Sequence, residues 1–484
     1  MRPPPEPEPQ PLSDPLDQAI LYFDANDPFT IRDACEGVQI FGGIGSGKTS
    51  GSGAQLAAAF LNAGFGGLVL TAKPDETDLW RRYVAKAGRS ADLILFGQEH
   101  AARFNALEYE RTRPGRGAGL TENLVELFDE LGQMDRKSEG NGIQDGSFWR
   151  TEQRKLVRNA IEALSLAGMA VSFPNINQVI QSAPRSEKQL TDEEWLDTSY
   201  LCDVLREATE RKEAEEFSDS QLNDFKVCRE YWHRDFPRLP DRVRAIAMAM
   251  YSGVGDVFVR GLLRQLFSES TTVTPEDTFA GKIIVLDLPQ KQFNEVGVFA
   301  QVLFKYCWQR AVERRKIERD SRPLFLWIDE SQHFVNKHDV GFQTTSRSAR
   351  VATVLLTQNL PNYYAVMGGE HASKALVDSL LGNLTTKIFH NNTCAITNQY
   401  AADLFARDWR QIPSSSISQA EGKFTTGSSQ AAHLEHTVLP REFTGLAKGG
   451  PPHDFTVEAI IHQGGKVFQC SGSNALKTTF RQET

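Results

Sequence analysis

A glycine-rich segment near the start of the chain, FGGIGSGKTS at residues 41–50, constrains the fold more than any other feature. It fits the pattern G-x-x-x-x-G-K-[ST] at every fixed position: Gly42, Gly47, Lys48 and Thr49. Glycines let consecutive backbone N–H groups turn toward phosphate oxygens, because no Cβ stands in the way. In this pattern the lysine reaches the β- and γ-phosphates, and the hydroxyl ligates Mg²⁺. The segment therefore predicts a site for ATP and Mg²⁺.

The residues on either side of this loop suit the same role. VQIF at residues 38–41 indicates a short buried strand, and TSGSGAQLAAAFLNAGF at residues 49–65 indicates a helix whose N-terminus faces the phosphates. A chance match to a glycine-rich pattern is the alternative, and these flanks argue against it. We expect the phosphates to be bound by Gly42, Gly43, Gly45, Ser46, Gly47, Lys48, Thr49 and Ser50.

An acidic pair, Asp329–Glu330, follows the apolar run LFLWI at residues 324–328. Such a run is typical of a central strand in a sheet that is covered on both faces. A carboxylate at the carboxyl end of this strand would lie beside the phosphate loop. Asp329 would then hold Mg²⁺ with Thr49, and Glu330 would polarise the attacking water as the catalytic carboxylate. The alternative is a strand that ends in a solvated acidic turn.

A further apolar strand, RVATVLLTQN at residues 350–359, ends in the polar pair Thr357–Gln358. In proteins of the RecA-like class, a polar residue at the tip of the strand beside the metal-holding strand senses the γ-phosphate. Gln358 is therefore the candidate sensor. The alternative is a glutamine that only caps its strand.

Composition indicates a globular protein and says little about its substrate. The formal net charge of −9 does not predict a nucleic-acid binder, but it also does not exclude one, because a motor can carry its basic residues in a pore. The six cysteines show neither C-x-x-C nor metal-ligand spacing, which favours reduced thiols and no zinc site. No uninterrupted apolar run approaches the roughly 20 residues that span a bilayer. We expect a cytoplasmic protein.

The order of the predicted elements indicates an α/β domain that is split by a helical insertion. Residues 1–28 begin with a Pro/Glu-rich stretch and are predicted to be a flexible tail. Residues 29–111 and 273–484 form the predicted nucleotide-binding domain, and residues 112–272 form the all-α insertion. Further strands are predicted at residues 66–74, 91–97, 281–289, 384–391, 455–463 and 465–471, and polar loops at 117–120, 138–147 and 414–433.

In the order of its motifs, the chain resembles the TraG/TraD-like coupling proteins of conjugation and type IV secretion, which belong to the FtsK/HerA superfamily of P-loop motors. Lys73-Pro74-Asp75-Glu76 is similar to that family's D-x-K-G-E, although Thr71 stands where the aspartate would be. Phe104-Asn105-Ala106-Leu107 is similar to F-N-P-L, with Ala106 in place of proline. Residues 146–149 resemble the start of the family's all-helical domain, and residues 382–392 fall in the family's order.

The resemblance implies a RecA-like P-loop fold and a hexameric ring with ATP sites between subunits and DNA in the central pore. An arginine from the neighbouring subunit would complete each site. Arg347 matches the family's arginine between Asp329 and Gln358, and Arg350 is its rival. Surface arginines on a helix are the alternative. The helical insertion would handle the relaxosome or DNA through the basic and aromatic patch Trp149, Arg150, Arg154, Lys155 and Arg158, unless this patch is only the solvated face of an amphipathic helix.

Family members begin with a transmembrane hairpin, whereas here the phosphate loop begins at residue 41. We therefore expect either a soluble branch or a protein held at the inner membrane by an anchor subunit. Three functions remain open. The first is a DNA pump that serves a transfer channel, with relaxase or channel proteins as partners. The second is a soluble HerA-like translocase in DNA processing or defence. The third is a nucleotide-locked scaffold or protein-docking subunit, against which the intact Glu330 argues.

Overall fold

A nine-stranded sheet forms the centre of the molecule. The computed structural model describes residues 14–135, 146–367, 371–420 and 423–482. The strands from β9 to β5 run parallel to one another, and β12 and β13 are added antiparallel at one edge. Their order across the sheet is β13 (Ala475–Arg481), β12 (Thr456–Gln463), β9 (Thr386–Phe389), β3 (Val38–Phe41), β8 (Val351–Thr357), β7 (Leu324–Ile328), β4 (Gly66–Leu70), β6 (Ile283–Asp287) and β5 (Leu93–Gly97).

Helices cover both faces of this sheet, which is why its central strands are mostly apolar, with buried exceptions such as Gln39 in β3 and Thr353 in β8. Alternate residues of β7 enter two separate cores. Leu324, Leu326 and Ile328 pack in the core that contains α14 (Gln290–Arg314), whereas Phe325 and Trp327 pack in the core that contains α2 (Ala54–Asn62) and α3 (Glu76–Lys86). The remaining helices around the sheet are α1 (Ile31–Cys35), α4 (Ala106–Thr112), α15 (Lys337–Ser346), α16 (Leu360–Val366), α17 (His371–Gly382) and α18 (Ala395–Leu404).

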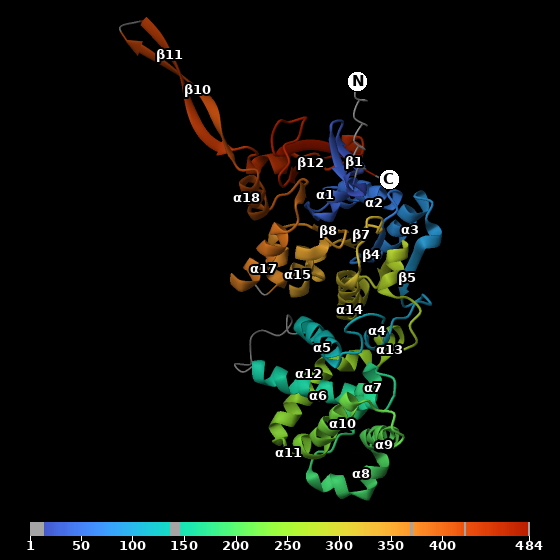
Figure 1. Cartoon of the computed structure of the whole chain (residues 1–484). Coiled ribbons are helices and arrows are strands. Elements are labelled where there is room, and N and C mark those ends of the chain that lie inside the picture. The colour runs from blue at the N-terminus through green and yellow to red at the C-terminus, as the bar shows by residue number, and fades with distance from the viewer. Residues whose placement is uncertain (1–13, 136–145, 368–370, 421–422, 483–484) are drawn as a thin grey trace, which may run out of the picture.

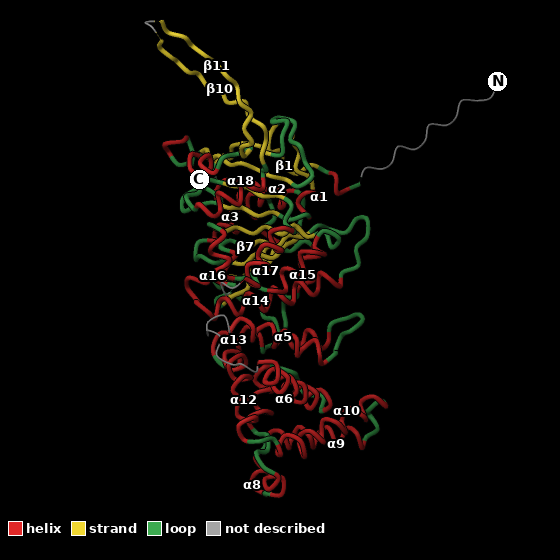
Figure 2. The backbone as a smooth tube through the Cα atoms, turned by 90° about the vertical axis from the view of Figure 1, so that its left-hand side faces the viewer, coloured by secondary structure: helices red, strands yellow, loops and turns green. Residues whose placement is uncertain are grey.

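Between β5 and β6 the chain makes a long excursion in which every regular element among the described residues is a helix. Figure 1 shows these helices gathered at one end of the molecule, and Figure 2 shows the strands confined to the rest. The excursion contains α5 (Thr121–Asp135), α6 (Gly146–Leu166), α7 (Phe173–Gln181), α8 (Glu193–Thr198), α9 (Tyr200–Glu213), α10 (Asp219–Glu230), α11 (Phe236–Arg238), α12 (Asp241–Gly255) and α13 (Gly261–Phe267). The predicted fold class, an α/β domain with a large all-helical insertion, is confirmed.

The two connections to the insertion lie side by side. The amide of Phe104 donates to the carbonyl of Leu266 at 2.8 Å, and the amide of Thr272 donates to the carbonyl of Arg103 at 2.9 Å. The insertion therefore leaves and rejoins the sheet domain at one place.

Two predicted elements in the C-terminal part were wrong. Residues 414–433 were predicted to be a polar loop, but their described part, 414–420 and 423–433, lies in two long antiparallel strands, β10 (Arg407–Ala420) and β11 (Lys423–His436), which we call the arm. Residues 465–471, predicted to be a strand, form an irregular turn. Its backbone is held by Asp27, whose carboxylate accepts from the amides of Gln469 at 2.8 Å and Cys470 at 3.2 Å. The last strand, β13, follows this turn.

Part of the predicted N-terminal tail is folded. Residues 19–30 form a hairpin of β1 (Ala19–Asp24) and β2 (Asp27–Thr30), in which Phe23 and Phe29 are buried. Burial of these two rings explains why this part of the predicted tail has a fixed structure. Residues 1–13 of the predicted tail and residues 138–145 of a predicted loop lie outside the described residues.

Within the described ranges, no single helix is both long and apolar enough to cross a membrane. Residues Asp241–Phe258 and Gly261–Phe267 meet the length and composition criteria only when taken together, across a bend of 79°.

Candidate functional site

The glycine-rich loop joins β3 to a π-helical turn, Thr49–Gly53, that continues into α2. Gly47 has a φ of +78°, and a Cβ there would lie 2.4 Å from Cγ1 of Val457. Gly42 has no room for a side chain, because a Cβ would lie 2.3 Å from the hydroxyl oxygen of Ser46. The amide of Gly43 donates to the carbonyl of Asn391 at 2.9 Å. Packing against β9 and β12 therefore holds the loop in shape.

The predicted metal ligands lie next to each other. The hydroxyl of Thr49 donates to Oδ2 of Asp329 at 2.9 Å, although the two residues come from opposite halves of the sequence. The parallel order β3-β8-β7 brings the carboxyl ends of these strands to one edge of the sheet. A hydroxyl and a carboxylate are hard oxygen ligands of the kind that Mg²⁺ prefers.

Glu330 lies at the centre of the site. Its Oε1 is 3.5 Å from Nζ of Lys48, and the side-chain amide of Gln358 donates to its two oxygens at 3.3 and 3.4 Å. The amide of Gln332 donates to Oε2 at 3.1 Å. Burial acts to raise the pKa of Glu330, but Lys48, Gln332 and other neighbours outweigh it and lower the pKa to about 2. The predicted water-activating carboxylate is thus ionised and oriented by three side chains.

The backbone of Glu330 is in the left-handed region, with φ 44° and ψ 48°. A glutamate in this region is uncommon and costs about 1–3 kcal/mol, which the surrounding contacts must offset. The conformation turns the chain sharply after β7, so that Asp329 and Glu330 both face the glycine-rich loop. Thr357 supports the arrangement by donating to the side-chain oxygen of Gln332 at 2.8 Å.

The structure adds two site residues that the sequence did not single out as site residues, Lys73 and Glu76. Nζ of Lys73 lies 3.3 Å from Glu330, 3.6 Å from Asp329 and 3.8 Å from Glu76. Burial acts to lower the pKa of Lys73, but these carboxylates together raise it above its ordinary value. Burial, followed by the nearby Asp329, raises the pKa of Glu76 to about 8. Their signal in the sequence was their place just after the buried strand β4, which pairs with β7.

His390 is a third residue that the sequence did not single out, and it contacts the π-helical turn that follows the phosphate loop. Its Nε2 lies 2.7 Å from the hydroxyl of Ser52, and its Nδ1 lies 3.0 Å from the carbonyl oxygen of Glu458. Burial lowers the pKa of His390 to about 4, so the ring is neutral at physiological pH. A neutral ring that donates from Nδ1 to the carbonyl accepts from Ser52 at Nε2. His390 therefore links the π-helical turn to β9 and β12.

The residues present fit a triphosphate and a divalent cation. The hydroxyl of Ser46, which is 1% exposed, is buried without a hydrogen-bond partner in the loop itself. A phosphate oxygen would supply that partner. On the outer side of the loop, the hydroxyl of Ser50 accepts from the side-chain amide of Gln482 at 2.8 Å. Gly45 has a φ of +68° and no atom near a Cβ position, so the tip of the loop is open.

The two candidate arginines lie away from this site. Both precede β8, whereas Gln358 follows it, so they belong to the opposite end of a strand that spans about 20 Å. Arg350 is used within its own chain, where it donates to the carbonyls of Arg319 and Ser321 at 2.9 Å each. The Arg347 side chain is 62% exposed and lies 3.3 Å from a carboxylate oxygen of Glu36.

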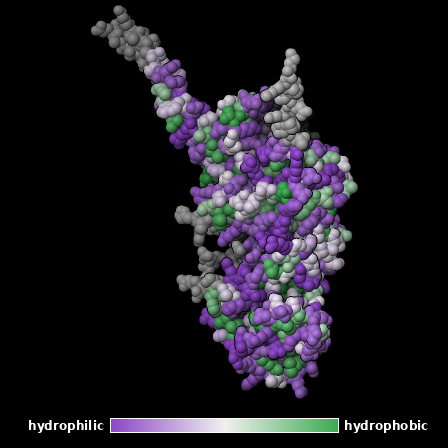
Figure 3. All heavy atoms as spheres, in the orientation of Figure 1, coloured by the Kyte–Doolittle hydropathy of each residue, from purple (hydrophilic) through white to green (hydrophobic). Residues whose placement is uncertain are grey.

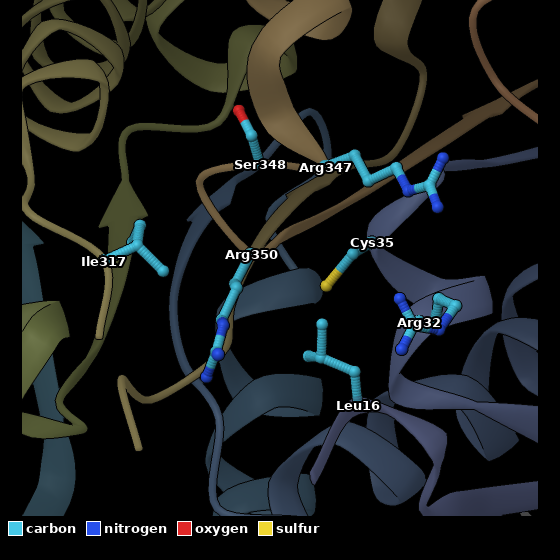
Figure 4. Close-up of a pocket in the computed structure, with 7 residues that line it drawn as sticks. All are labelled: Leu16, Arg32, Cys35, Ile317, Arg347, Ser348 and Arg350. Carbon is cyan, nitrogen blue, oxygen red and sulfur yellow. The ribbon is translucent and has the colours of Figure 1, made fainter. Parts of the chain in front are cut away.

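Figure 4 shows Arg347 and Arg350 extending in different directions from the segment before β8. Both line a cavity of about 330 Å³ together with Leu16, Arg32, Cys35, Ile317 and Ser348. The structure therefore does not bring either arginine to the nucleotide site of the same chain. Of the two, Arg347 is the more exposed.

Three of the four basic residues of α6 are engaged within the insertion, and the fourth, Arg150, is exposed. Arg154 pairs with Glu122 and Asp129, Arg158 pairs with Glu122, and Lys155 pairs with Glu152. These contacts favour the interpretation of the patch as the solvated face of an amphipathic helix over its interpretation as a DNA-binding surface.

Comparison with known proteins identifies the fold. No protein-family model matches the sequence, and no curated protein matches it either. Among solved structures, the bacterial conjugative coupling protein TrwBdeltaN70, in its unbound monoclinic form, superposes with a TM-score of 0.56 at 14% identity, over 96% of this chain and 90% of that one. The plasmid coupling protein TrwB in complex with ADP and Mg²⁺ gives 0.55 at 13% identity, over 96% and 90%. The same protein in complex with a non-hydrolysable ATP analogue gives 0.54 at 14%, over 97% and 91%. The chain has the fold of the conjugative coupling protein TrwB.

Proposed function

We propose that this protein is an ATP-hydrolysing motor that moves DNA toward a conjugation or type IV secretion apparatus. The observation that carries the proposal is the ionised Glu330, which Lys48, Gln332 and Gln358 hold beside the glycine-rich loop. The TrwB structures with ADP and Mg²⁺ and with an ATP analogue support the choice of ligand, because that protein shares the fold. A site that only bound nucleotide would have no use for an oriented carboxylate.

The roles of the residues follow from their chemistry. Lys48 and the backbone N–H groups of the loop bind the phosphates, and Thr49 and Asp329 hold the metal ion. The chemistry that Mg²⁺ supplies when bound is neutralisation of charge on the phosphate oxygens. Glu330 accepts a hydrogen bond from the attacking water and draws its proton away. Gln358, whose side-chain amide donates to this carboxylate, would report to it whether the terminal phosphate is present.

The proposal includes a ring of identical subunits, with six as the expected number. Arg347 lies at the end of β8 opposite the loop and is exposed, as an arginine must be if it completes the site of a neighbouring copy. The cytoplasm is the proposed location, with attachment at the inner membrane through an anchor subunit. Relaxase and secretion-channel proteins are the proposed partners.

Steady-state ATPase activity tests the proposal most directly. The purified full chain is assayed without DNA and with single- or double-stranded DNA over a range of salt concentrations, and Glu330→Gln protein reveals any contaminating ATPase. We expect DNA to stimulate turnover and the stimulation to fade as salt rises, because contacts with phosphates release counterions. Turnover that ignores DNA would favour a scaffold or protein-docking subunit instead. No turnover in the wild type would contradict the proposed activity.

A further inference from the structure

The site holds a second lysine for which the motor chemistry above has no task. Lys73 follows β4 and places its Nζ within 4 Å of Asp329 and Glu330, the carboxylates assigned to the metal ion and to the water. Both carboxylates are buried, whereas the Lys73 side chain is 38% exposed. Lys73 therefore reaches in from the rim of the site, across the gap between two neighbouring strands.

Lys48 and Lys73 both pair with Glu330, but only Lys48 is also expected to bind the phosphates of the nucleotide. Among the described residues, these two lysines alone form an ion pair with Glu330. Lys48 belongs to the glycine-rich loop, and in this type of loop the lysine turns to the β- and γ-phosphates when nucleotide binds. The groups that then remain on Glu330 are the neutral amides of Gln332 and Gln358, together with the ammonium of Lys73.

We propose that Lys73 is a positioning residue, the counter-ion that keeps Glu330 aimed at the water while Lys48 is engaged with phosphate. The inference rests on the proposed ATPase function. A hydrogen bond between two charged groups is roughly twice as strong as one between neutral groups, so the Lys73 ion pair fixes the direction of Glu330 more firmly than the amides of Gln332 and Gln358 do alone. With Lys73 in place, Glu330 keeps a charged partner when substrate binds.

The backbone around Lys73 is built to hold this position. The amide of Ala72 donates to Oε2 of Glu76 at 2.7 Å, and the amide of Glu76 donates to the carbonyl of Lys73 at 3.3 Å. These two bonds close the turn between β4 and α3, and Pro74 within the turn restricts it further. The turn pins the Cα of Lys73 at the carboxyl edge of β4, beside β7, so the side chain needs little freedom to find Glu330.

The test compares Lys73→Met, which keeps length but removes charge, with Lys73→Arg, which keeps charge. Lys316→Met is the matched control, because Lys316 is 86% exposed on the loop after α14. ATPase kcat and KM and the affinity for a fluorescent ATP analogue are measured for each full-length protein, with melting temperature as a check on folding. We expect Lys73→Met to lower kcat about 10- to 100-fold, a part of what a general base contributes. KM and analogue affinity should change less than about threefold, since ground-state binding is not removed.

We further expect Lys73→Arg to recover most of the lost kcat and Lys316→Met to match the wild type. Wild-type kcat in Lys73→Met would overturn the inference, and so would a lower kcat that arginine cannot rescue or a Lys73→Met protein that fails to fold. A raised KM at unchanged kcat would make Lys73 a phosphate-binding residue instead. Full turnover at a lower Mg²⁺ requirement would mean that Lys73 only occupies the metal position. An inactive wild type would contradict the proposed function itself, and this outcome is distinct from all the others.

Discussion

The carboxyl edge of the sheet and the arm are stabilised by different kinds of contact. At the sheet edge, side chains from several elements are buried and bonded to one another, as Lys48, Glu330 and Gln358 show. In the arm, every side chain described at residues 407–415 and 428–434 is exposed, and Figure 3 shows the arm standing clear of the body. Trp409 and Leu434 face each other across its base and are 67% and 49% exposed.

The arm is held by its backbone ladder, which pairs the strands residue by residue from Arg407–His436 to Ala420–Lys423. A lone two-stranded hairpin is marginally stable in water, whereas a buried network transmits every change to its neighbours. The comparison teaches that single substitutions should be costly at the sheet edge and nearly silent in the arm.

The largest loss of ATPase activity should come from substitution of Arg347, which lies outside both regions. Such a loss would show that the nucleotide site is incomplete within one chain. We expect Lys48→Ala to abolish nucleotide binding, and Arg347→Ala to bind normally but lose about 10³- to 10⁵-fold in turnover, the range for an arginine supplied in trans. Mixing the two inactive proteins should restore part of the activity, because some interfaces then combine an intact loop with an intact arginine. Arg407→Ala, on the arm, is the matched control and should behave as wild type. If no mixing ratio restores turnover, Arg347 does not act in trans.

Within the site, Glu330→Gln should lower kcat by about 10²- to 10⁴-fold, the share that a general base contributes. Bound ATP should then persist, since glutamine keeps the shape of the side chain and leaves the loop intact. Retention of radiolabelled ATP after gel filtration measures this. The arm offers Asp408→Asn as a control of the same chemical type, for which we expect no change. A Glu330→Gln protein that hydrolyses ATP at the wild-type rate would remove water activation from this residue.

A smaller effect, on stability, should come from His390. Its pKa in the folded protein is about 4, below the ordinary value of 6.5, so the unfolded chain takes up a proton first as pH falls. Stability is therefore lost between pH 6.5 and pH 4, by about 2 kcal/mol between pH 7 and pH 5. Urea unfolding at the two pH values should show that His390→Gln lacks this part of the pH dependence. His433→Gln, at an exposed arm position, should retain the full pH dependence of stability. Equal pH dependence in both variants would mean that His390 is not buried as a neutral ring.

The smallest effect on stability and activity should come from removal of most of the arm. Replacing residues 411–432 by Asn-Gly joins the cross-strand pair Arg410–His433 through a tight two-residue turn. We expect the melting temperature to change by less than about 2 °C, which corresponds to less than about 2 kcal/mol at an unfolding entropy of about 2.1 cal/mol/K per residue. ATPase activity without DNA should also be unchanged. A large loss of stability would show that the arm packs against the body after all, and the comparison would then fail.

Much of the site could be predicted because its residues follow recognisable strands. Buried parallel strands give uninterrupted apolar runs, so Asp329 and Gln358 could be placed at strand ends from the sequence alone. Lys73 and His390 could not be placed, because their roles depend on which strands are neighbours: β4 lies beside β7, and β9 lies beside β3. The sequence carries no direct signal of this order.

The arm was predicted to be a loop for a related reason. Strand prediction relies on apolar alternation, which reports a face that packs on a core. Serine is the commonest residue of the arm, and beyond its base at His436 the described side chains of residues 407–415 and 428–434 are exposed on both faces. The opposite error arose at residues 465–471, where Val467 and Phe468 look like a strand. In the structure Phe468 anchors a turn, while Val467 is exposed.

The adjacent connections of the helical insertion have a consequence for the order of folding. β5 and β6 are neighbours in the sheet, yet the whole insertion separates them along the chain. Pairing them while the insertion is unfolded would cost the entropy of closing a very long loop. An insertion that has already folded holds its two ends together through the bonds of Phe104 with Leu266 and of Arg103 with Thr272. Once the insertion has folded, pairing β5 with β6 costs only the entropy of closing a short connection. The stability of the insertion therefore contributes to the folding of the nucleotide-binding domain.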